Sequence, residues 1–530
     1  MISPNGPQKA PMAGVHSWNL SFGAASTVVL GFLVRVYLFA RNPIINPDGI
    51  VYIQQAKALY FGLFDQVLNC YYYLSPYPLL VAFWYRFLGD WVIAAQWVNI
   101  IFSTLTIIPL FWLLKRFFPD SNAWITAMVY ALLPAYALAG TWVIRDPVFW
   151  FFAVTGLYFF ILHMEKRSFL WLMLSSICFA AGAWFRMEGS LFILVSSLFL
   201  LYSGKKHFWK DLAVFMAPYV IAAAAGILLV HFRDIDLMEL LKPERLLSRP
   251  LDFFTQYSSL RAQLKTLYNN DLVNTVPFFF QRVRNLIWLI ALGTLLVQLA
   301  ETLFYLFFIL LAVGMVTWTK RLKTDPRVVY LGTLSILSLA LLYSQIIYNW
   351  AMTSRFLAVF LFPAFIFIGA GIERMATFLS SRFHLRGNHV YAIIVVIILS
   401  LLLPKILRTN SDKDKLAYRE IGAYIAERED NSRVISICGD FKQVKAIHFF
   451  ANVNFPGAPC FENGVIAKRT DPNGLKIMLK HHCNYLIFNQ KDCKDNAFET
   501  LPADTGKQLN RLGEWPSERL GELILYEVVQ

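Results

Sequence analysis

The sequence predicts an all-α polytopic membrane domain followed by a small C-terminal α/β domain outside the membrane. The first observation is composition: of 530 residues, 57% are hydrophobic and only 15% are charged, against about 45–50% apolar and about 25% charged in soluble domains. The second is a series of long apolar runs, and the third is a polar tail after the last run. This composition excludes a soluble enzyme, a disordered chain and a disulfide-stapled secreted module.

The apolar runs predict about eleven membrane-spanning helices, since a span takes roughly 17–25 residues. The runs lie near residues 19–40, 91–114, 122–141, 146–163, 169–185, 188–203, 211–231, 296–318, 328–348, 356–373 and 390–404. The stretch 285–318 is too long for one ordinary span. We therefore expect its first part to form an interfacial helix that leads into the span.

Basic residues gather on every second connection between these runs. They are Lys115 and Arg116; Lys166 and Arg167; Lys205 and Lys206; Lys320, Arg321 and Lys323; and Arg374, Arg382 and Arg386. Because cytoplasmic loops are enriched in Lys and Arg, this alternation predicts that the N-terminus lies inside and the chain after Pro404 outside. It also explains the net charge of +14, so no nucleic-acid partner is expected.

The predicted topology divides the chain into a cytoplasmic segment (1–18), a membrane domain (19–404) and an outer domain (405–530). Two outer segments of the membrane domain are large. The first loop, 41–90, is expected to carry juxtamembrane helices. The second, 232–285, interleaves charges with Leu, Phe and Tyr, as do helices that lie on a membrane surface.

The outer domain alternates helical and strand-like stretches, which indicates an α/β fold. A helical stretch at 418–429 precedes strand-like runs at 433–438, 485–488 and 522–529. Four cysteines lie in this domain, namely Cys438, Cys460, Cys483 and Cys493. An oxidising compartment permits disulfides, but four cysteines allow three connectivities, and free buried thiols fit the sequence equally well.

Two aspartates stand in apolar sequence on the predicted outer side. Asp48 follows Pro47 in INPDGIVYIQQAKAL, and Asp146 precedes Pro147 in TWVIRDPVFWFF. Each fits a helix N-cap, which alone explains an Asp at such a position. Each also fits a functional site, because ionisable groups set in membrane sequence commonly mark one. The two interpretations are compatible, since capping fixes the orientation of a carboxylate.

Two arginines are candidates for binding an anion at the same side. Arg186 and Glu188 occupy the short turn WFRMEGSLF, and Arg355 lies at the outer mouth of a later span, near Asn349. A guanidinium holds phosphate through forked hydrogen bonds. The alternative is a side chain that extends to the lipid headgroups and anchors the helix.

Arg35 lies within the first predicted span, where an isolated charge is costly. We expect it to need an acidic partner, either Asp146 or Asp48. Elsewhere the sequence has no nucleotide-binding glycine loop, no Cys/His metal spacing and no Ser/His/Asp arrangement. The missing phosphate-binding loop argues against a nucleotide-sugar or ATP-driven reaction.

In these residues the chain resembles the GT-C superfamily of membrane glycosyltransferases, and within it the branch of aminoarabinose transferases and protein O-mannosyltransferases. The resemblance follows the order of the motifs over nearly the whole membrane part. The motifs are Asp48 with Tyr52 and Ala56 after it, SPYPLLVAFWYRFLGD at 75–90, QWVN at 96–99, Asp146, and Arg355 with Phe356 and Pro363. One departure is Gly49, where many relatives carry a second acid.

The resemblance implies an inverting transfer of a sugar from a polyprenyl-phosphate donor to an acceptor on the outer face of the membrane. Asp48 is then the general base, Asp146 a second catalytic acid group, and Arg186 and Arg355 the donor-phosphate ligands. Further expected substrate contacts are Tyr52, Tyr77, Glu188 and Asn349. No obligatory cofactor is expected, although a divalent metal is compatible with the two aspartates.

The expected partners are the lipid-linked donor, membrane lipids, and a lipid, polysaccharide or protein acceptor. No outward-facing glycosylation sequon is evident, which favours a bacterial inner membrane, with the site facing the periplasm. Two rival functions fit less well. A transporter or flippase places its ionisable residues near the bilayer midplane, and a polysaccharide ligase or polymerase depends on a large outer loop late in the chain.

Overall fold

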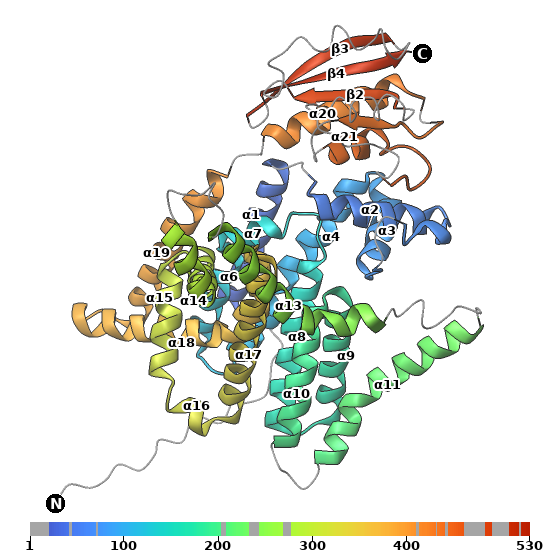
Figure 1. The fold of residues 1–530 in the computed structure, drawn as a ribbon. Coiled ribbons are helices and arrows are strands. Elements are labelled where there is room, and N and C mark those ends of the chain that lie inside the picture. The colour runs from blue at the N-terminus through green and yellow to red at the C-terminus, as the bar shows by residue number, and fades with distance from the viewer. Residues whose placement is uncertain are drawn as a thin grey trace, which may run out of the picture.

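The computed structural model describes residues 21–41, 45–69, 73–202, 208–232, 243–268, 277–409, 413–430, 432–439, 444–460, 483–489, 508–518 and 521–529. Most of these residues form a body of helices, and a smaller domain with a β-sheet lies at one end of it (Figure 1). The predicted segment 1–18, and also Tyr71, Tyr72 and Cys493, lie outside the described residues.

The helices of the body come first in the chain. They are α1 (Phe22–Arg41), α2 (Pro47–Tyr60), η1 (Phe64–Gln66), α3 (Tyr77–Leu88), α4 (Trp91–Leu105), α5 (Ile107–Leu114), α6 (Asp120–Leu132), α7 (Pro134–Ala139), α8 (Asp146–Lys166), α9 (Phe169–Phe185), η2 (Met187–Gly189), α10 (Ser190–Tyr202), α11 (Phe208–Phe232), α13 (Pro243–Tyr268), α14 (Pro277–Thr302), α15 (Leu306–Thr317), α16 (Arg321–Thr324), α17 (Pro326–Asn349), η4 (Ser354–Leu357), α18 (Ala358–Phe383) and α19 (Gly387–Leu407).

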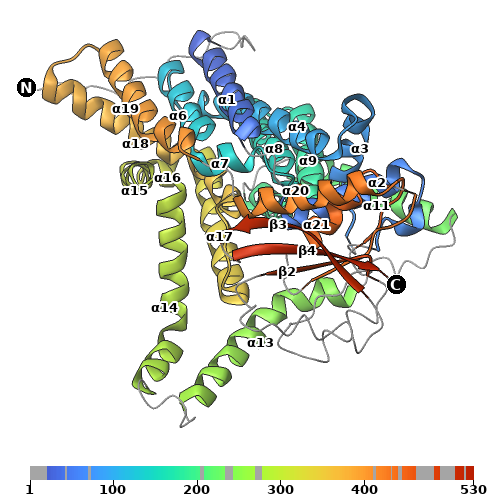
Figure 2. The ribbon, with the colours of Figure 1, turned by 90° about the horizontal axis from the view of Figure 1, so that it is seen from above.

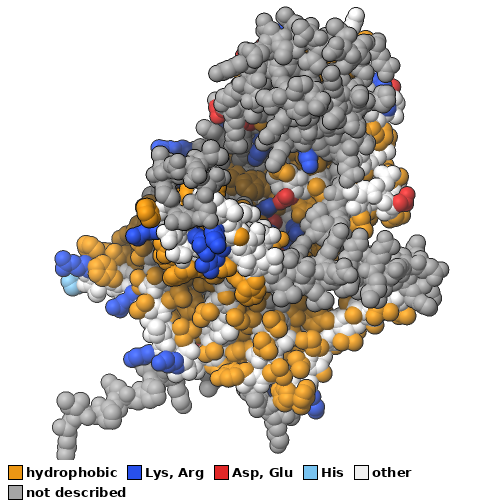
Figure 3. All heavy atoms as spheres, viewed as in Figure 1, with side chains coloured by type: hydrophobic (Ala, Val, Ile, Leu, Met, Phe, Trp, Pro, Cys, Tyr) orange, Lys and Arg blue, Asp and Glu red, His pale blue; other side chains and the backbone are white. Residues whose placement is uncertain are grey.

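The body is a multi-span membrane domain. Within the described residues, eight helical segments are long and apolar enough to cross a membrane, and three shorter apolar helices accompany them. The segment Ser354–Phe383 is the most enclosed of the eight, with 89% of its apolar window buried. Hydrophobic side chains cover much of the outer surface of the helical body (Figure 3), as expected where lipid replaces water.

Two predicted spans differ from the observed helices. The run 122–141 is broken at Pro134 into α6 and α7, because proline cannot continue the hydrogen-bond ladder of α6. The stretch 285–318 forms two helices, α14 and α15, whose break falls between Thr302 and Leu306. Phe304 and Tyr305 lie at this break and have φ of 53° and 52°, in the left-handed region. The apolar composition of the stretch does not predict such a turn.

The loop 41–90 carries helices α2 and α3, as predicted. Near the start of this loop, Asn46 and Pro47 open α2, since proline fits the first turn of a helix. The loop ends at Gly89, whose φ of 69° closes α3 in the left-handed conformation that suits glycine. Asp90 then caps α4 by accepting a hydrogen bond from the Ile93 amide at 2.8 Å.

The C-terminal domain contains helices α20 (Lys413–Arg428) and α21 (Val444–Ala451) and a four-stranded sheet. Its strands are β1 (Ile437–Gly439), β2 (Tyr485–Asn489), β3 (Gln508–Ser517) and β4 (Gly521–Val529), in the order β1-β2-β4-β3. β1 and β2 are parallel, and the other pairs are antiparallel. Strand β3 was not predicted from the sequence, because its Pro516 argues against a strand. The strand forms at an edge of the sheet, where a proline is tolerated.

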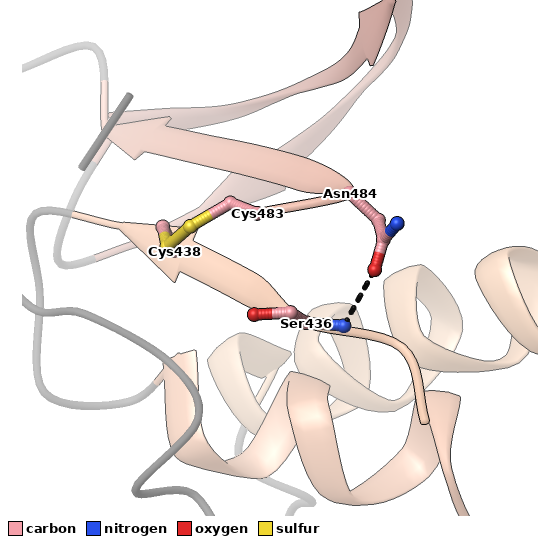
Figure 4. The surroundings of a disulfide bond; sticks show 4 residues. All are labelled: Ser436, Cys438, Cys483 and Asn484. Carbon is pink, nitrogen blue, oxygen red and sulfur yellow. Dashed lines mark hydrogen bonds between the residues drawn. A yellow bond between two sulfur atoms is a disulfide. The ribbon is translucent and has the colours of Figure 1, made fainter. Parts of the chain in front are cut away.

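Cys438 on β1 and Cys483 just before β2 form a disulfide (Figure 4). Because β1 and β2 are neighbours in the sheet, the Cα atoms of Cys438 and Cys483 lie 6.0 Å apart, within the usual range for a disulfide. Asn484 supports the same junction, because its side-chain oxygen accepts a hydrogen bond from the Ser436 amide at 2.9 Å. Cys438 therefore pairs with Cys483, one of the pairings that the sequence left open.

The C-terminal domain lies against the end of the body that carries α2. Helix α21 packs on α2, and α20 and α21 lie between the sheet and the helical body in Figure 1. Seen from above, the sheet lies over the helices of the body (Figure 2). Acidic and basic side chains gather in a hollow between this domain and the body (Figure 3). The candidate site lies at this end of the membrane domain.

Candidate functional site

A pocket of about 530 Å³ collects charged side chains from segments far apart in the sequence. Four elements supply its lining: the first half of α2, the start of α8, the end of α9 and the turn η4. The lining residues are Asp48, Val51, Tyr52, Arg145, Asp146, Arg186, Arg355 and Phe356. Two carboxylates and three guanidinium groups therefore share one cavity.

Asp48 lies in the first turn of α2 and does not cap it. Asn46 is the N-cap residue, so the N-cap interpretation of Asp48 is wrong by two positions. The carboxylate is instead directed to the pocket, where Oδ2 accepts a hydrogen bond from Nη2 of Arg355 at 2.7 Å. Its side chain is 47% exposed. Asp48 is therefore the more accessible of the two pocket carboxylates.

Gly49 explains why no second acid follows Asp48. A Cβ atom at this position would lie 2.8 Å from Cβ of Val143 and 2.9 Å from the Val143 carbonyl oxygen. Those atoms belong to the turn that leads into α8. The first turn of α2 therefore packs directly on the segment that carries the second aspartate, which leaves no room for a larger side chain.

Asp146 is the first residue of α8 and is buried, with 2% of its side chain exposed. The N-cap residue of α8 is Arg145, one residue earlier than Asp146, which was the N-cap expected from the sequence. The Asp146 carboxylate forms an ion pair with Nη1 of Arg186 through Oδ1, and Oδ2 lies 3.9 Å from Nη1 of Arg355. A buried carboxylate needs such partners, because desolvation of an unpaired charge is costly.

Arg186 is held between two acids. It follows the last residue of α9 with an extended backbone, and the turn η2 then brings Glu188 beside it. Nη2 and Nε of Arg186 contact Oε1 and Oε2 of Glu188 at 2.6 and 3.3 Å. The guanidinium also lies 4.6 Å from the ring centre of Phe356. The side chain is thus directed inward, and does not extend toward lipid headgroups.

Arg355 links the two aspartates that the sequence singled out. It lies in η4, and its guanidinium contacts Asp48 through Nη2 and approaches Asp146 through Nη1. Its Nε is buried without a hydrogen-bond partner in the structure. One arginine therefore bridges carboxylates that are almost one hundred residues apart in the chain.

Arg145 lines the pocket, although it was not among the site residues predicted from the sequence. No acid within the described residues lies within 4 Å of its guanidinium, and Nη1 is buried without a hydrogen-bond partner. The rings of Tyr52 and Tyr73 lie 5.9 and 5.2 Å from its guanidinium carbon. The available signal was a lone Arg in an otherwise apolar outer turn.

The remaining predicted site residues differ in their distance from the pocket. Tyr52 lines it. Tyr77 is fully buried behind Tyr52, edge-on to its ring, and its hydroxyl donates to the Ala95 carbonyl at 3.0 Å. Glu188 is not a lining residue, but it forms an ion pair with Arg186, which lines the pocket. Asn349 ends α17 on the surface and is not part of the pocket lining.

The expected acidic partner of Arg35 is not present. Arg35 is fully buried, and its Nε donates to Oγ of Ser103 at 2.8 Å. Nη1 donates to the carbonyl oxygens of Gly31 and Ala131 at 2.9 and 3.1 Å. Neutral oxygens of three helices thus satisfy much of this guanidinium, because polar side chains within a membrane domain find partners on neighbouring helices.

The pocket offers few ligands for a metal ion. Within the described residues, no group of three or more His, Cys, Asp or Glu side chains is arranged to hold one. Asp48 and Asp146, the acids expected to serve as ligands, both face Arg355.

Comparisons with known proteins agree with this architecture. Residues 76–231 match the family model described as dolichyl-phosphate-mannose-protein mannosyltransferase. A search of curated protein sequences gives no significant match.

Solved structures share the fold at low sequence identity. ArnT from Cupriavidus metallidurans, bound to undecaprenyl phosphate, has a TM-score of 0.51 at 14% identity, over 95% of this chain and 97% of ArnT. The archaeal oligosaccharyltransferase AglB from Archaeoglobus fulgidus, in complex with an inhibitory peptide and a dolichol-phosphate, has a TM-score of 0.53 at 11% identity, over 91% of this chain and 70% of AglB.

A further structure of the Archaeoglobus fulgidus oligosaccharyltransferase, in complex with Zn and sulfate, has a TM-score of 0.55 at 12% identity, over 88% of this chain and 68% of that one. The order of the motifs, the family match and the shared fold all agree with one another. The chain therefore shares the fold of ArnT and of the archaeal oligosaccharyltransferases, and residues 76–231 match the mannosyltransferase family model.

Proposed function

We propose that this protein transfers a sugar from a polyprenyl-phosphate donor to an acceptor hydroxyl in the pocket around Asp48 and Asp146. The acceptor oxygen attacks the anomeric carbon while the bond between this carbon and the phosphate oxygen breaks. The hydroxyl proton passes to the Asp48 carboxylate. The products are the glycoside, with inverted anomeric configuration, and the free polyprenyl phosphate.

Asp48 suits the role of general base because its carboxylate is half exposed and reaches the pocket. A general base must lie within hydrogen-bond reach of the proton it accepts. Asp146 is almost fully buried and engaged by two arginines, so it is less able to meet an incoming acceptor. Its proposed role is to fix the positions of Arg186 and Arg355.

The arginines provide positive charge where the leaving phosphate gains negative charge. Arg355 already lies between the two carboxylates, and Arg145 lines the same cavity with no acid of the described residues within ion-pair distance. Fixed cationic groups aimed at developing charge are among the strongest catalytic contributions. We assign the phosphate to Arg145 and Arg355, whereas Arg186 mainly holds Asp146 and Glu188.

The reaction is proposed to take place on the outer side of a bacterial inner membrane. The support is the alternation of basic loops, which puts the first loop and the C-terminal domain on that side. A pocket at the end of the helical body suits a donor whose sugar lies at the surface while its lipid chain stays in hydrocarbon. The acceptor is a lipid, a polysaccharide or a protein, and the glycan comparison below identifies which of these it is.

The contact of Arg355 with both Asp48 and Asp146 is the single observation that carries this proposal. It joins the two carboxylates into one open pocket at one end of the body. A flippase would need ionisable groups along a path through the membrane, whereas these groups converge in a single cavity.

The test is to delete the gene and compare the glycans of the cell envelope by mass spectrometry. The deletion should remove one sugar from one class of molecule, and the wild-type gene should restore it. The Asp48→Asn variant should not restore it at wild-type membrane levels. If the variant restores the glycan fully, or if deletion changes only the sidedness of the lipid-linked sugar, the proposal is wrong.

A further inference from the structure

Helix α2 carries a buried ionisable residue at the end opposite Asp48. Lys57 is fully buried. Its Nζ donates to the carbonyl oxygens of Asn452 and Val453 in the C-terminal domain, both at 3.0 Å. These two residues directly follow α21, so Lys57 binds the polar end of a helix of another domain. The contact joins positions almost four hundred residues apart.

The surroundings of Lys57 suit a neutral amine. Within the described residues no carboxylate lies within ion-pair distance of it, and burial lowers the pKa of Lys57 to about 7. An uncharged amine has two N–H groups, which match the two carbonyl oxygens. The Asn452 carbonyl also accepts a hydrogen bond from the Phe455 amide at 3.2 Å, and Lys57 adds a donor from α2 to both carbonyls.

Apolar contacts surround the same junction. Ala58 of α2 is buried in one cluster with Val67 of the first loop and Ala458 of the C-terminal domain. Phe449 and Phe450 of α21 belong to the large core formed by the membrane helices. The C-terminal domain is therefore packed into the first loop and the helical body, and is not a separate unit on a linker.

We infer that Lys57 is a positioning residue through which the C-terminal domain holds α2, and with it Asp48, in place over the pocket. Nine residues separate Lys57 from Asp48 along one helix, a rise of about 14 Å. A shift at the Lys57 end therefore moves the carboxylate. The N-cap Asn46 makes no side-chain capping bond, so the Asp48 end depends on packing and on Arg355. The effect on catalysis rests on the proposed function; the mechanical coupling does not.

The coupling is testable by hydrogen exchange on the full-length protein in detergent or nanodiscs. Lys57→Met keeps the length of the side chain and removes its N–H groups. Gln55→Met is the matched control on the same helix: Gln55 is equally buried, and its Nε2 donates to the Tyr73 carbonyl in the first loop at 3.1 Å.

We expect Lys57→Met to speed exchange about tenfold in two segments at once, residues 47–60 and residues 444–451, because lost hydrogen bonds of order 1 kcal/mol change opening equilibria by that factor. Gln55→Met should leave 444–451 unchanged. The inference is overturned if exchange in 444–451 is unaffected by Lys57→Met, or if both variants change it equally.

Kinetics then separate positioning from general stability. Once the donor and acceptor are identified, Lys57→Met should lower kcat several-fold and leave KM for the donor within twofold, because the phosphate ligands are untouched. An unchanged kcat with the exchange effect intact would remove the catalytic part of the inference. If the wild-type protein transfers no sugar while the exchange coupling holds, the proposed function fails and the coupling stands.

Discussion

The buried arginines of the membrane body and of the pocket solve the same problem in different ways. Arg35 in α1 is fully buried and Arg186 is 5% exposed. Arg35 binds only neutral oxygens, from Ser103 and two backbone carbonyls. Arg186 binds the carboxylates of Asp146 and Glu188. Burial alone therefore does not mark a functional arginine in this protein.

The two environments also differ in whether they are closed. Beside Arg35 the chain is closely packed, since a Cβ atom added at Gly140 would lie 2.6 Å from Oγ of Ser103 and 3.0 Å from Nε of Arg35. Arg186 instead lines an open pocket that holds both aspartates. We therefore expect substitutions at Arg35 to affect stability, and substitutions in the pocket to affect sugar transfer.

The largest expected effect belongs to the pocket carboxylate. Asp48→Asn should lower the rate of transfer about 10²–10⁴-fold, the usual contribution of a positioned base. The thermal unfolding midpoint should stay close to that of the wild type, because the side chain is half exposed. Asp65→Asn, an exposed change in η1 of the same loop, is the matched control. Equal losses in both variants would contradict the role of Asp48.

A smaller effect is expected at Arg145. Arg145→Met should weaken binding of a polyprenyl phosphate about 10–100-fold, since a hydrogen bond to a charged group is worth about 1.5–3 kcal/mol. Binding of the uncharged polyprenol should not change. Titration of both lipids into the purified protein measures the difference. Equal affinities of variant and wild type for the phosphate would remove Arg145 from the site.

The junction at Lys57 should show a pH dependence. Burial lowers the pKa of Lys57 from 10.5 to about 7 in the docked state, so docking releases a proton between these two values. Docking should therefore strengthen as the pH rises above about 7 and become independent of pH below it. Hydrogen exchange of residues 444–451 in the wild type and in Lys57→Met, at pH 7 and pH 9, measures this.

Other ionisable side chains also lie on α2 and on the elements packed against it. The ionisable side chains of α2 and of the elements packed against it are Asp48, Tyr52, Tyr60, Asp65, Tyr77, Tyr85, Arg86, Lys445 and His448. Burial lowers the pKa of His448 to about 4, so its imidazole stays neutral from pH 7 to 9. A difference between the two proteins that does not grow with pH would count against Lys57 as the titrating group.

The smallest effect on transfer is expected in the closed site. Arg35→Ala should lower the free energy of unfolding by about 2–4 kcal/mol, because it leaves a cavity and removes the buried hydrogen bonds to Ser103 and Ala131. Transfer per folded molecule should stay within twofold. Thermal unfolding and activity normalised to folded protein test the two statements. A large loss of specific activity would show that the closed and open sites are functionally coupled.

The predictable features were those that leave a periodic or compositional pattern. Long apolar runs and alternating basic loops gave the membrane helices, and Asp48, Asp146, Arg186 and Arg355 stood out as charges in apolar sequence. The contacts of Arg35 were not predictable, because its partners are backbone and hydroxyl oxygens that no sequence pattern reveals.

Other features depend on tertiary packing alone. The break at Phe304 arises from two left-handed residues within apolar sequence. Lys57 resembles any helix lysine in the sequence, and only the fold brings it to Asn452 and Val453. Arg145 is visible as a charge in the sequence, but only the fold shows that Arg186 and Arg355 contact both aspartates and that no acid of the described residues pairs with Arg145.

The most direct test of the account is transfer by the purified protein in proteoliposomes containing a single polyprenyl-phosphate sugar. Each sugar transferred should release one polyprenyl phosphate, the anomeric configuration seen by NMR should be inverted, and Asp48→Asn should abolish both signals. Retention of configuration, or transfer that continues at the wild-type rate without the Asp48 carboxylate, would contradict a single displacement assisted by this residue.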